Sequence, residues 1–345
     1  PAWGGADSTV SIGSTVNTTA WGGHTWVQSD FGAAFTVRLT SSNGGGNLNL
    51  DQLLVTVYYT VPVPTTTVGD GVSPANKVLR GSEINQAVSA FTLSTNMGAD
   101  TVANLVVTGT NTANVAANGV KIYRDNGGTA NEWDATDTLV GTASFAGATA
   151  TFSGINLAVT TTSTQYIITY DIAAAPTNGQ IMTGVVSGVT ATNAITNNDT
   201  ADATLTIDTV APTVTNVDSP TAAGTYNTGD TITIRVTFNE NVTVSGTPQI
   251  TLETGTTDRT INYATGSGST QITFTYVVQA GDTSTDLDYV ANSLALNGGV
   301  IRDAALNNAV LTLPAPGGAG SLSANEALVI DTTAPTVTIN QAVGQ

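Results

Sequence analysis

Hydrophobic and polar residues alternate with a period of two along most of this chain. The alternation is clear at 35–39 and from Thr231 to Val244, and short clusters of Gly, Asn and Asp separate such stretches. A period of two is typical of β-strands that bury one face. The 3.6-residue period of amphipathic helices is hard to find, so the pattern predicts an all-β protein.

The stretch up to residue 208 contains a regular series of such alternating segments. Turn-forming Gly and Asn residues separate them at the spacing expected of a β-sandwich. The predicted strands are 88–93, 103–109, 119–123, 138–141, 149–153, 165–171, 181–189 and 202–207.

An eight-residue pattern, Asp-Thr-x-Ala-Pro-Thr-Val-Thr, occurs at 208–215 and again at 331–338. In each copy an acidic residue ends an apolar strand, and a new alternating strand follows the proline. Proline fixes φ and lacks an N–H donor, so a strand cannot run straight through it. The copies lie 331 − 208 = 123 residues apart, about the length of one β-sandwich domain of roughly 100 residues. We interpret both copies as joints between modules.

These joints divide the chain into modules. The segment 1–64 is a short β segment plus a linker, because the proline-containing stretch 61–68 predicts an extended connection. A β-sandwich module occupies 65–208 and another occupies 209–331. Residues 332–345 form a hinge and the first strand of a further module, or a donor strand. The residues of that assembly strand are Thr336, Val337, Thr338, Ile339 and Asn340.

Composition narrows the classes of partner. Eight basic residues against 25 acidic ones give a net charge of −17. Nucleic acid is not expected as a partner, because phosphate binding needs clustered Lys or Arg. The carboxylates suit hard cations or simply keep the surface soluble. There is no cysteine, and no apolar run reaches the roughly 20 residues of a membrane span.

The segments Thr231–Val244, 248–253, 274–282, 294–299 and 301–307 resemble, in order, a bacterial Ig-like repeat. Such repeats occur in tandem in large secreted adhesins and surface-layer proteins. The resemblance implies tandem Ig-like β-sandwich modules, an extracellular setting at the cell surface, and a scaffolding or adhesive role without an enzymatic reaction. The Trp-Gly-Gly segments near the start, with the strand at 53–59, resemble the last part of a bacterial jelly-roll module.

One acidic loop is a candidate calcium site. Carboxylate and amide oxygens crowd a glycine-containing loop, and Ca²⁺ takes six to eight oxygen ligands in flexible geometry. The alternative is a solvated hairpin loop whose Asp and Asn side chains make Asx-turns. The candidate ligands are Asp125, Asn126, Asn131, Asp134 and Asp137.

The joints are a second candidate site for a cation. Asp208 and Asp331 each end a module beside a hinge, Glu240 follows a strand, and Asp303 begins a turn. A cation that links a strand-end carboxylate to neighbouring loops would stiffen a joint. The alternative is that each Asp caps its own turn.

Aromatic residues near the start suggest a further hypothesis. Trp3, Trp21 and Trp26 would stack on sugar rings of a glycan, or they would be core residues of the jelly-roll-like segment. The single histidine, His24, has no nucleophile motif beside it, so we expect no enzyme. Lys77 and Lys121 are the only lysines, so a Lys–Asn cross-link would be confined to the module at 65–208.

The sequence therefore favours an extracellular structural protein, a subunit of a surface layer or filament or the stalk of an adhesin. In one version the final strand completes a sheet of the next copy, which gives a homopolymer. In the simpler version residues 1–345 are a segment of a longer chain. The alternative from a different class is a carbohydrate-binding adhesive module that uses the N-terminal tryptophans to bind a host-surface ligand.

Overall fold

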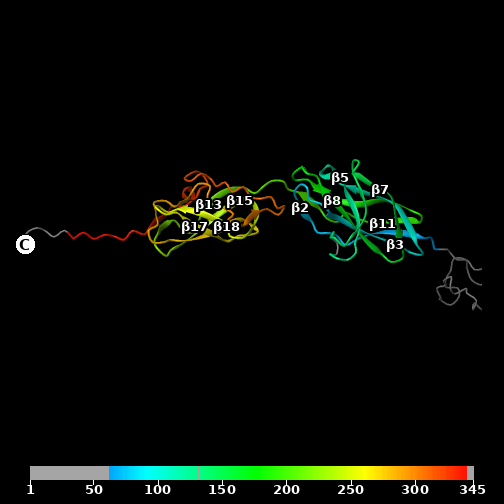
Figure 1. Ribbon diagram of the computed structural model, residues 1–345, viewed down its shortest axis with the longest axis horizontal. Helices are drawn as coiled ribbons and strands as arrows, with labels where there is room; N and C mark the ends of the chain where they lie inside the picture. The colour runs from blue at the N-terminus through cyan, green and yellow to red at the C-terminus, as the bar shows by residue number, and fades with distance from the viewer. Residues whose placement is uncertain (1–61, 130–131, 340–345) are drawn as a thin grey trace, which may run out of the picture. The chain divides into compact units, whose positions relative to one another are not determined.

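The computed structural model describes residues 62–129 and 132–339 (Figure 1). The chain divides into two units, 1–63 and 64–345, and all that follows concerns the second. The predictions for the jelly-roll-like segment with its tryptophans, for Asn131 and for Asn340 fall outside the described residues. Strands make up 51% of the described residues and helices only 3%, which confirms the all-β prediction.

The strands of the first β-sandwich lie between residues 65 and 207. They are β1 (Thr65–Asp70), β2 (Lys77–Leu79), β3 (Gln86–Thr95), β4 (Asp100–Gly109), β5 (Val115–Arg124), β6 (Thr138–Ala143), β7 (Thr149–Val159), β8 (Thr164–Ile172), β9 (Ile181–Met182), β10 (Gly184–Ala191), β11 (Ala194–Asn197) and β12 (Leu205–Ile207), with a 3₁₀ turn at Thr112–Asn114. One sheet has the order β11-β1-β3-β8-β5-β6, a second has β10-β4-β7, and a third has β2-β12-β9.

The linker predicted over 61–68 is wrong in its second half. Thr65–Asp70 forms β1, which pairs with β3 on one side and β11 on the other. Thr66 and Val68 are fully buried, so alternate residues of this stretch face the core. The sequence of this stretch suggests a spacer because Val68 is its only apolar residue. One apolar residue cannot show the alternation with a period of two that marks a half-buried strand.

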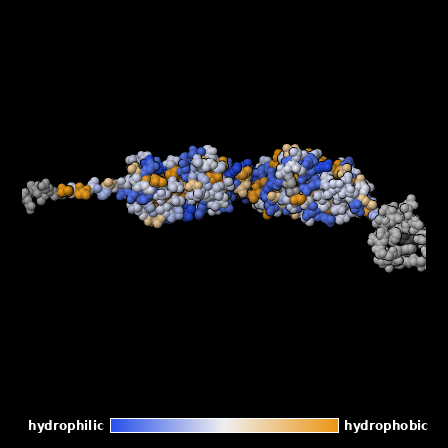
Figure 2. Space-filling view, turned by 90° about the horizontal axis from the view of Figure 1, so that it is seen from below, coloured by the Kyte–Doolittle hydropathy of each residue, from blue (hydrophilic) through white to orange (hydrophobic). Residues whose placement is uncertain are grey.

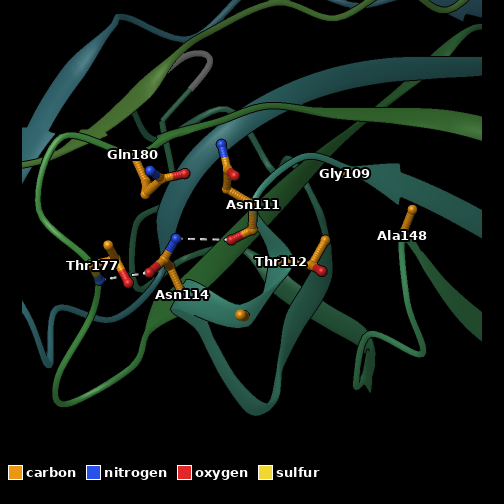
Figure 3. Close-up of a pocket in the computed structure, with 8 residues that line it drawn as sticks. Gly109, Asn111, Thr112, Asn114, Ala148, Thr177 and Gln180 are labelled. Atoms are coloured by element: carbon orange, nitrogen blue, oxygen red, sulfur yellow. Dashed lines mark hydrogen bonds between the residues drawn. The ribbon is translucent and has the colours of Figure 1, made fainter.

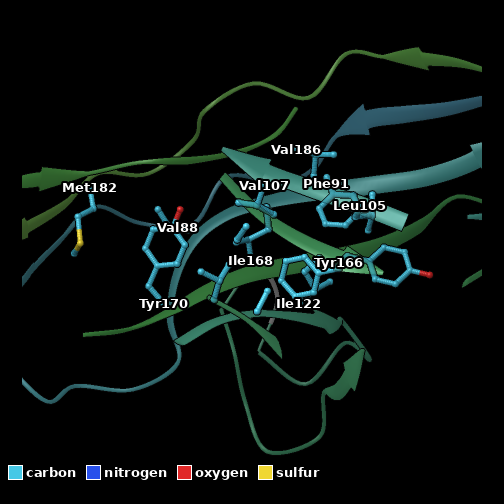
Figure 4. Packing of buried hydrophobic residues seen from close by; sticks show 14 of the residues in the cluster. Val88, Phe91, Leu105, Val107, Ile122, Tyr166, Ile168, Tyr170, Met182 and Val186 are labelled. Carbon is cyan, nitrogen blue, oxygen red and sulfur yellow. The ribbon is translucent and has the colours of Figure 1, made fainter. Parts of the chain in front are cut away.

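Aromatic and aliphatic side chains from facing sheets fill the core of this sandwich (Figure 4). The rings of Phe91 and Tyr166 stack with centroids 5.2 Å apart. Tyr170 is fully buried, and its hydroxyl donates a hydrogen bond to the Thr183 carbonyl at 3.0 Å. A buried tyrosine needs such an acceptor, because an unpaired hydroxyl in an apolar core is destabilising.

The second β-sandwich lies between residues 214 and 331. Its elements are β13 (Val214–Asp218), β14 (Gly224–Tyr226), β15 (Thr231–Ser245), β16 (Gln249–Glu253), β17 (Arg259–Thr265), β18 (Ser269–Val277), β19 (Thr283–Ser284), β20 (Asp288–Tyr289), β21 (Val300–Arg302), the short helix α1 (Leu322–Asn325) and β22 (Leu328–Asp331). One sheet has the order β13-β15-β18-β17-β16-β20 with β21 beside β15, and another has β14-β22-β19.

The long strand β15 organises this sandwich. Its residues Ile232, Ile234, Val236 and Phe238 are all buried, as the alternating sequence predicts, and join a core separate from that of the first sandwich. The pairing of β15 with β18 shifts register between Thr237 and Val242, and beyond the shift β15 also pairs with β21. Such an irregularity bends a strand and redirects its side chains. Glu240 lies within it.

The only α-helix among the described residues, α1, has four residues. Within 62–129 and 132–339, no helix is long and apolar enough to cross a membrane.

Candidate metal centre

Three carboxylates that are far apart in sequence meet where the chain passes from the first sandwich to the second. Asp208, Glu240 and Asp303 each offer an oxygen within 4.8 Å of the others. Asp208 directly follows β12, Glu240 lies at the irregularity of β15, and Asp303 follows β21. Since β21 pairs with the end of β15 and Arg302 lies opposite Thr243, Asp303 follows at the level of Val242, two residues from Glu240.

Hydrogen bonds from Asn307 hold this group together. Its backbone N–H and its side-chain amide donate to the two carboxylate oxygens of Asp303, at 2.8 and 2.9 Å. The same amide donates to the backbone oxygen of Asp208 at 3.0 Å. A turn of the second sandwich therefore fixes the connecting segment that carries Asp208.

The three carboxylates repel one another. The pKa of Glu240 is raised, first by burial and then by the negative charges of Asp208 and Asp303. Asp303 is only 2% exposed, and no ion pair found among the described residues includes any of the three. A divalent cation would remove this repulsion, and an all-oxygen set of carboxylates suits Ca²⁺ in particular.

Asp331, the fourth residue predicted for the joints, does not belong to this group. It makes the same local turn as Asp208: the Asp208 carboxylate accepts the Val210 N–H at 3.0 Å, and the Asp331 carboxylate accepts the Thr333 N–H at 2.9 Å. Both copies of the repeated pattern therefore use their Asp as a turn cap. In the first copy the Asp also faces two other carboxylates.

The acidic loop at 125–137 is arranged differently. The Asp134 carboxylate accepts hydrogen bonds from the backbone N–H groups of Thr129 and Thr136 and from the Thr136 hydroxyl. The bonds from Thr136, followed by that from Thr129, lower the pKa of Asp134 to about 2. The bond from the Thr136 N–H, two residues on, is the Asx-turn contact of the alternative interpretation.

The other candidate ligands of this loop are also engaged within the protein. Asp125 accepts from Gly127 N at 2.7 Å and from the Gln165 amide at 2.9 Å, while Asp137 accepts from Asn126 N and Asp134 N. Among the described residues the loop carboxylates do not form a group of three within metal-binding reach. Calcium binding here stays a prediction.

The predicted assembly strand is described up to Ile339. Residues 332–339 have no regular secondary structure, and Val337 and Ile339 are 86% and 87% exposed. Figure 2 shows hydrophobic residues on the surface of this extended segment. The equivalent residues at the first copy of the pattern, 213–216, lie largely in β13, which pairs with β15. The segment at 336–339 therefore has a strand sequence without a neighbouring strand in the described part of the chain.

A polar surface pocket of about 360 Å³ lies at the 3₁₀ turn of the first sandwich (Figure 3). Asn114 donates to the Asn111 carbonyl at 3.0 Å and accepts the Thr177 N–H at 2.8 Å across this pocket. Its lining consists of amide, hydroxyl and small side chains, and these bonds commit its Asn groups to the backbone.

Sequence reasoning missed Asn307, which holds the metal-centre carboxylates in place. The signal was its position four residues after Asp303, the spacing at which a side chain can close a tight turn onto a carboxylate. The second contact of the Asn307 amide, with the Asp208 carbonyl, depends on tertiary structure, so no sequence pattern could have predicted it.

Comparisons with known proteins give little guidance. No protein-family model and no curated protein matches this chain. A solved structure from Corynebacterium diphtheriae, named "putative membrane anchored protein", aligns with 72% of this chain at 11% identity and a TM-score of 0.17. This chain spans about half, 54%, of that protein. Similarity at this level supports no argument about fold or function.

Proposed function

We propose that this chain is a non-enzymatic, extracellular structural protein of a bacterial cell surface, built from tandem Ig-like β-sandwich modules. It serves as a subunit of a surface layer or filament, or as the stalk of an adhesin. The proposal rests on two complete sandwich cores in series, a polar surface low in charged residues, and the resemblance of 209–331 to a bacterial Ig-like repeat.

Calcium stiffens the joint between these modules. The observation that supports this most strongly is the meeting of Asp208, on the connecting segment, with Glu240 and Asp303 of the following sandwich. A bound Ca²⁺ would offset two of the three negative charges and cross-link the connecting segment to that sandwich. Without the ion, repulsion between the carboxylates would favour local opening of the segment.

Limited proteolysis tests this function of the joint. The full chain is digested with and without Ca²⁺, and cleavage between Asp208 and Thr213 is followed by mass spectrometry. We expect Ca²⁺ to slow cleavage there in the natural sequence and in Asp331→Asn, which alters the matching turn cap outside the carboxylate group. We expect no protection in Asp303→Asn. Equal cleavage with and without Ca²⁺ would remove calcium from the proposal.

Head-to-tail assembly through the final strand is the second part of the proposal. Residues 336–339 repeat the strand pattern of β13 and expose Val337 and Ile339, so they are suited to pair with a sheet edge, either in another copy or in a continuation of the chain. Electron microscopy of the purified chain distinguishes these. Filaments that disappear in Val337→Asp/Ile339→Asp support strand exchange between copies, and dispersed single molecules of the natural sequence contradict it.

A surface location is tested separately on the source cells. An antibody against the second sandwich should label intact cells as strongly as lysed cells. Labelling that appears only after lysis would contradict an extracellular structural role.

A further inference from the structure

A buried polar cluster in the first sandwich joins one of the two lysines to an asparagine. The Lys121 ammonium lies 2.8 Å from the Asn85 side-chain oxygen and 2.7 Å from the Asp171 carboxylate. The Tyr123 hydroxyl donates to the same Asn85 oxygen at 3.0 Å. Asn85 and Tyr123 are buried, and the Lys121 and Asp171 side chains are less than one-fifth exposed.

Strand order and register produce this juxtaposition. Strand β8 lies between β3 and β5, and Lys121 of β5 is the partner of Thr169 in β8. Asp171 follows Thr169 by two residues and therefore faces the same side of the sheet. Asn85 immediately precedes β3, whose first residue, Gln86, pairs with Tyr170. Asp171 thus lies between the lysine and the asparagine.

The backbone fixes the asparagine in place. Asn85 adopts φ +55°, a left-handed conformation that asparagine tolerates better than most residues. Its N–H donates to the Asp171 carboxylate at 2.8 Å, and the Ile172 N–H donates to the Glu83 carbonyl at 2.7 Å. The backbone at Asn85 is therefore held against the end of β8 by its own N–H and by the carbonyl of Glu83, two residues earlier.

These four groups have the complementary roles that amide exchange requires. The Lys121 amine is a nucleophile 2.8 Å from the Asn85 side-chain oxygen, and that oxygen is joined to Cγ, the carbon to be attacked, by one carbonyl bond of about 1.2 Å. Tyr123 donates to the oxygen on which negative charge would develop. Asp171 touches the amine and is placed to accept its proton. Because the fold already holds the amine and the amide in contact, the reaction does not incur the entropy cost of bringing two separate molecules together.

We propose that Lys121 and Asn85 become joined by an intramolecular isopeptide bond, with Asp171 as the proton carrier and Tyr123 as the oxyanion-stabilising donor. This modification site is independent of the proposed calcium site.

The reaction balances without any further reagent. The Lys121 ammonium gives a proton to the Asp171 carboxylate, and the neutral amine attacks Cγ of Asn85 to form a C–N bond. The carbonyl electrons move to the oxygen that Tyr123 holds. Asp171 passes a proton to the side-chain nitrogen of Asn85, which leaves as ammonia when the carbonyl re-forms. The second proton lost by the amine leaves with the ammonia as ammonium.

The bond would fasten the start of β3 to β5 across β8, over a sequence separation of 36 residues. A covalent link of this kind restricts the unfolded chain as a disulfide does. It would give a chain that has no cysteine a permanent cross-link in one of its sandwiches, which suits a protein that bears load.

Mass spectrometry of the full, denatured chain tests the proposal directly. The natural sequence should be lighter than its calculated mass by one ammonia. Trypsin cleaves after Arg80, Lys121 and Arg124, but it does not cleave after an acylated lysine. We therefore expect a peptide 81–124 lacking one ammonia in place of the peptide 81–121. The full calculated mass, with cleavage after Lys121, would overturn the proposal.

Matched variants separate the cross-link from other losses of ammonia. Lys121→Arg and Asp171→Asn should restore the full mass, whereas Lys77→Arg, which changes the other lysine, should keep the deficit. Cyclisation at the Asn118-Gly119 pair would also release ammonia, but it would persist in Lys121→Arg and leave cleavage after Lys121 intact. A deficit that survives Lys121→Arg therefore contradicts the isopeptide bond, whether or not the variants fold fully.

Discussion

The side-chain amide of Asn307 donates a hydrogen bond to the backbone oxygen of Asp208 at 3.0 Å, across 99 residues of sequence. The same amide contacts the buried carboxylate of Asp303. One residue of a turn therefore holds both the connecting segment and a carboxylate of the candidate metal centre. Removing the Asn307 side chain should therefore loosen the connecting segment even in the absence of a metal ion.

Asn307→Ala should lower the free energy of unfolding of the second sandwich by about 1–3 kcal/mol, because it removes the side-chain donor to one oxygen of the buried Asp303 carboxylate and to the Asp208 carbonyl, while the backbone N–H of residue 307 keeps its bond to the other Asp303 oxygen. Chemical denaturation measures this change. Asn262→Ala, an exposed asparagine of β17 in the same sandwich, is the matched control and should have little effect. Equal losses in the two variants would show that the Asn307 bonds are unimportant.

Asp199 should make the first sandwich less stable as the pH rises. Its pKa is raised to about 7, first by burial and then by Asp202 and Asp70, while the Val186 N–H opposes the shift. The folded state therefore binds more protons than the unfolded state between pH ~4 and ~7, and stability falls across that window.

Asp199→Asn removes this penalty, which amounts to roughly 4 kcal/mol above pH 7 as an upper bound. The variant should be more stable than the natural sequence at pH 8 and should show a flatter pH profile of its denaturation midpoint. A natural sequence whose first sandwich gains stability from pH 4 to 7, with no change in the variant, would contradict the assignment.

Asp282 should have the opposite pH dependence in the second sandwich. Burial alone would raise its pKa, but hydrogen bonds from Arg259, Gln279 N–H and Tyr276 outweigh burial and lower it. Its contribution to stability is therefore present above the unfolded pKa of about 3.9 and is lost as the pH falls through the lowered folded value.

Tyr276→Phe tests that contribution, because the Tyr276 hydroxyl donates to the Asp282 carboxylate at 2.8 Å. We expect a loss of about 1.5–3 kcal/mol at pH 7, the usual range for a hydrogen bond to a charged group. The loss should shrink in acid, where the carboxylate is protonated. Tyr263→Phe is the control, since that hydroxyl accepts from Ser267 N–H at an exposed position. A loss independent of pH would argue against the charged bond.

The two hydrophobic cores should respond to mutation separately. Phe91 and Phe274 are each fully buried, in different clusters. Truncation of either to alanine should cost about 3–5 kcal/mol, and calorimetry should show the Phe91→Ala loss only in the unfolding of the first sandwich and the Phe274→Ala loss only in that of the second. One shared transition that moves in both variants would contradict separate cores.

Much of the fold could be predicted from the sequence because its strands carry visible apolar patterns. The segment 231–244 alternates and matches β15, which buries one face. The segments predicted at 88–93 and 165–171 are rich in apolar residues and match β3 and β8, whose middle residues are buried on both faces. The sequence does not reveal strand β1, because its first three residues are all threonine, although the second of them is buried. Burial of a threonine does not show as hydrophobicity in the sequence. Strand β11, with four residues, was too short to show a period.

The candidate sites were less predictable than the strands. The sequence suggested Asp208, Glu240 and Asp303 because its pattern predicts each at the end of a strand or the start of a turn, and the structure brings these three together. The predicted position of Glu240 is wrong, because β15 continues to Ser245 and Glu240 lies inside it, at the register shift. Nothing in the sequence distinguished Asp208 from Asp331, because their local turns are the same. The Lys121–Asn85 contact depends on which strand lies between β3 and β5, and this order is a property of the sheet.

A calcium titration of the full chain by isothermal calorimetry tests the central claim most directly. We predict a saturable site in the natural sequence and in Asp331→Asn, lost or weakened at least tenfold, about 1.4 kcal/mol, in both Asp303→Asn and Glu240→Gln. The absence of saturable binding to the natural sequence, or binding that survives both substitutions unchanged, would contradict a calcium-stiffened joint.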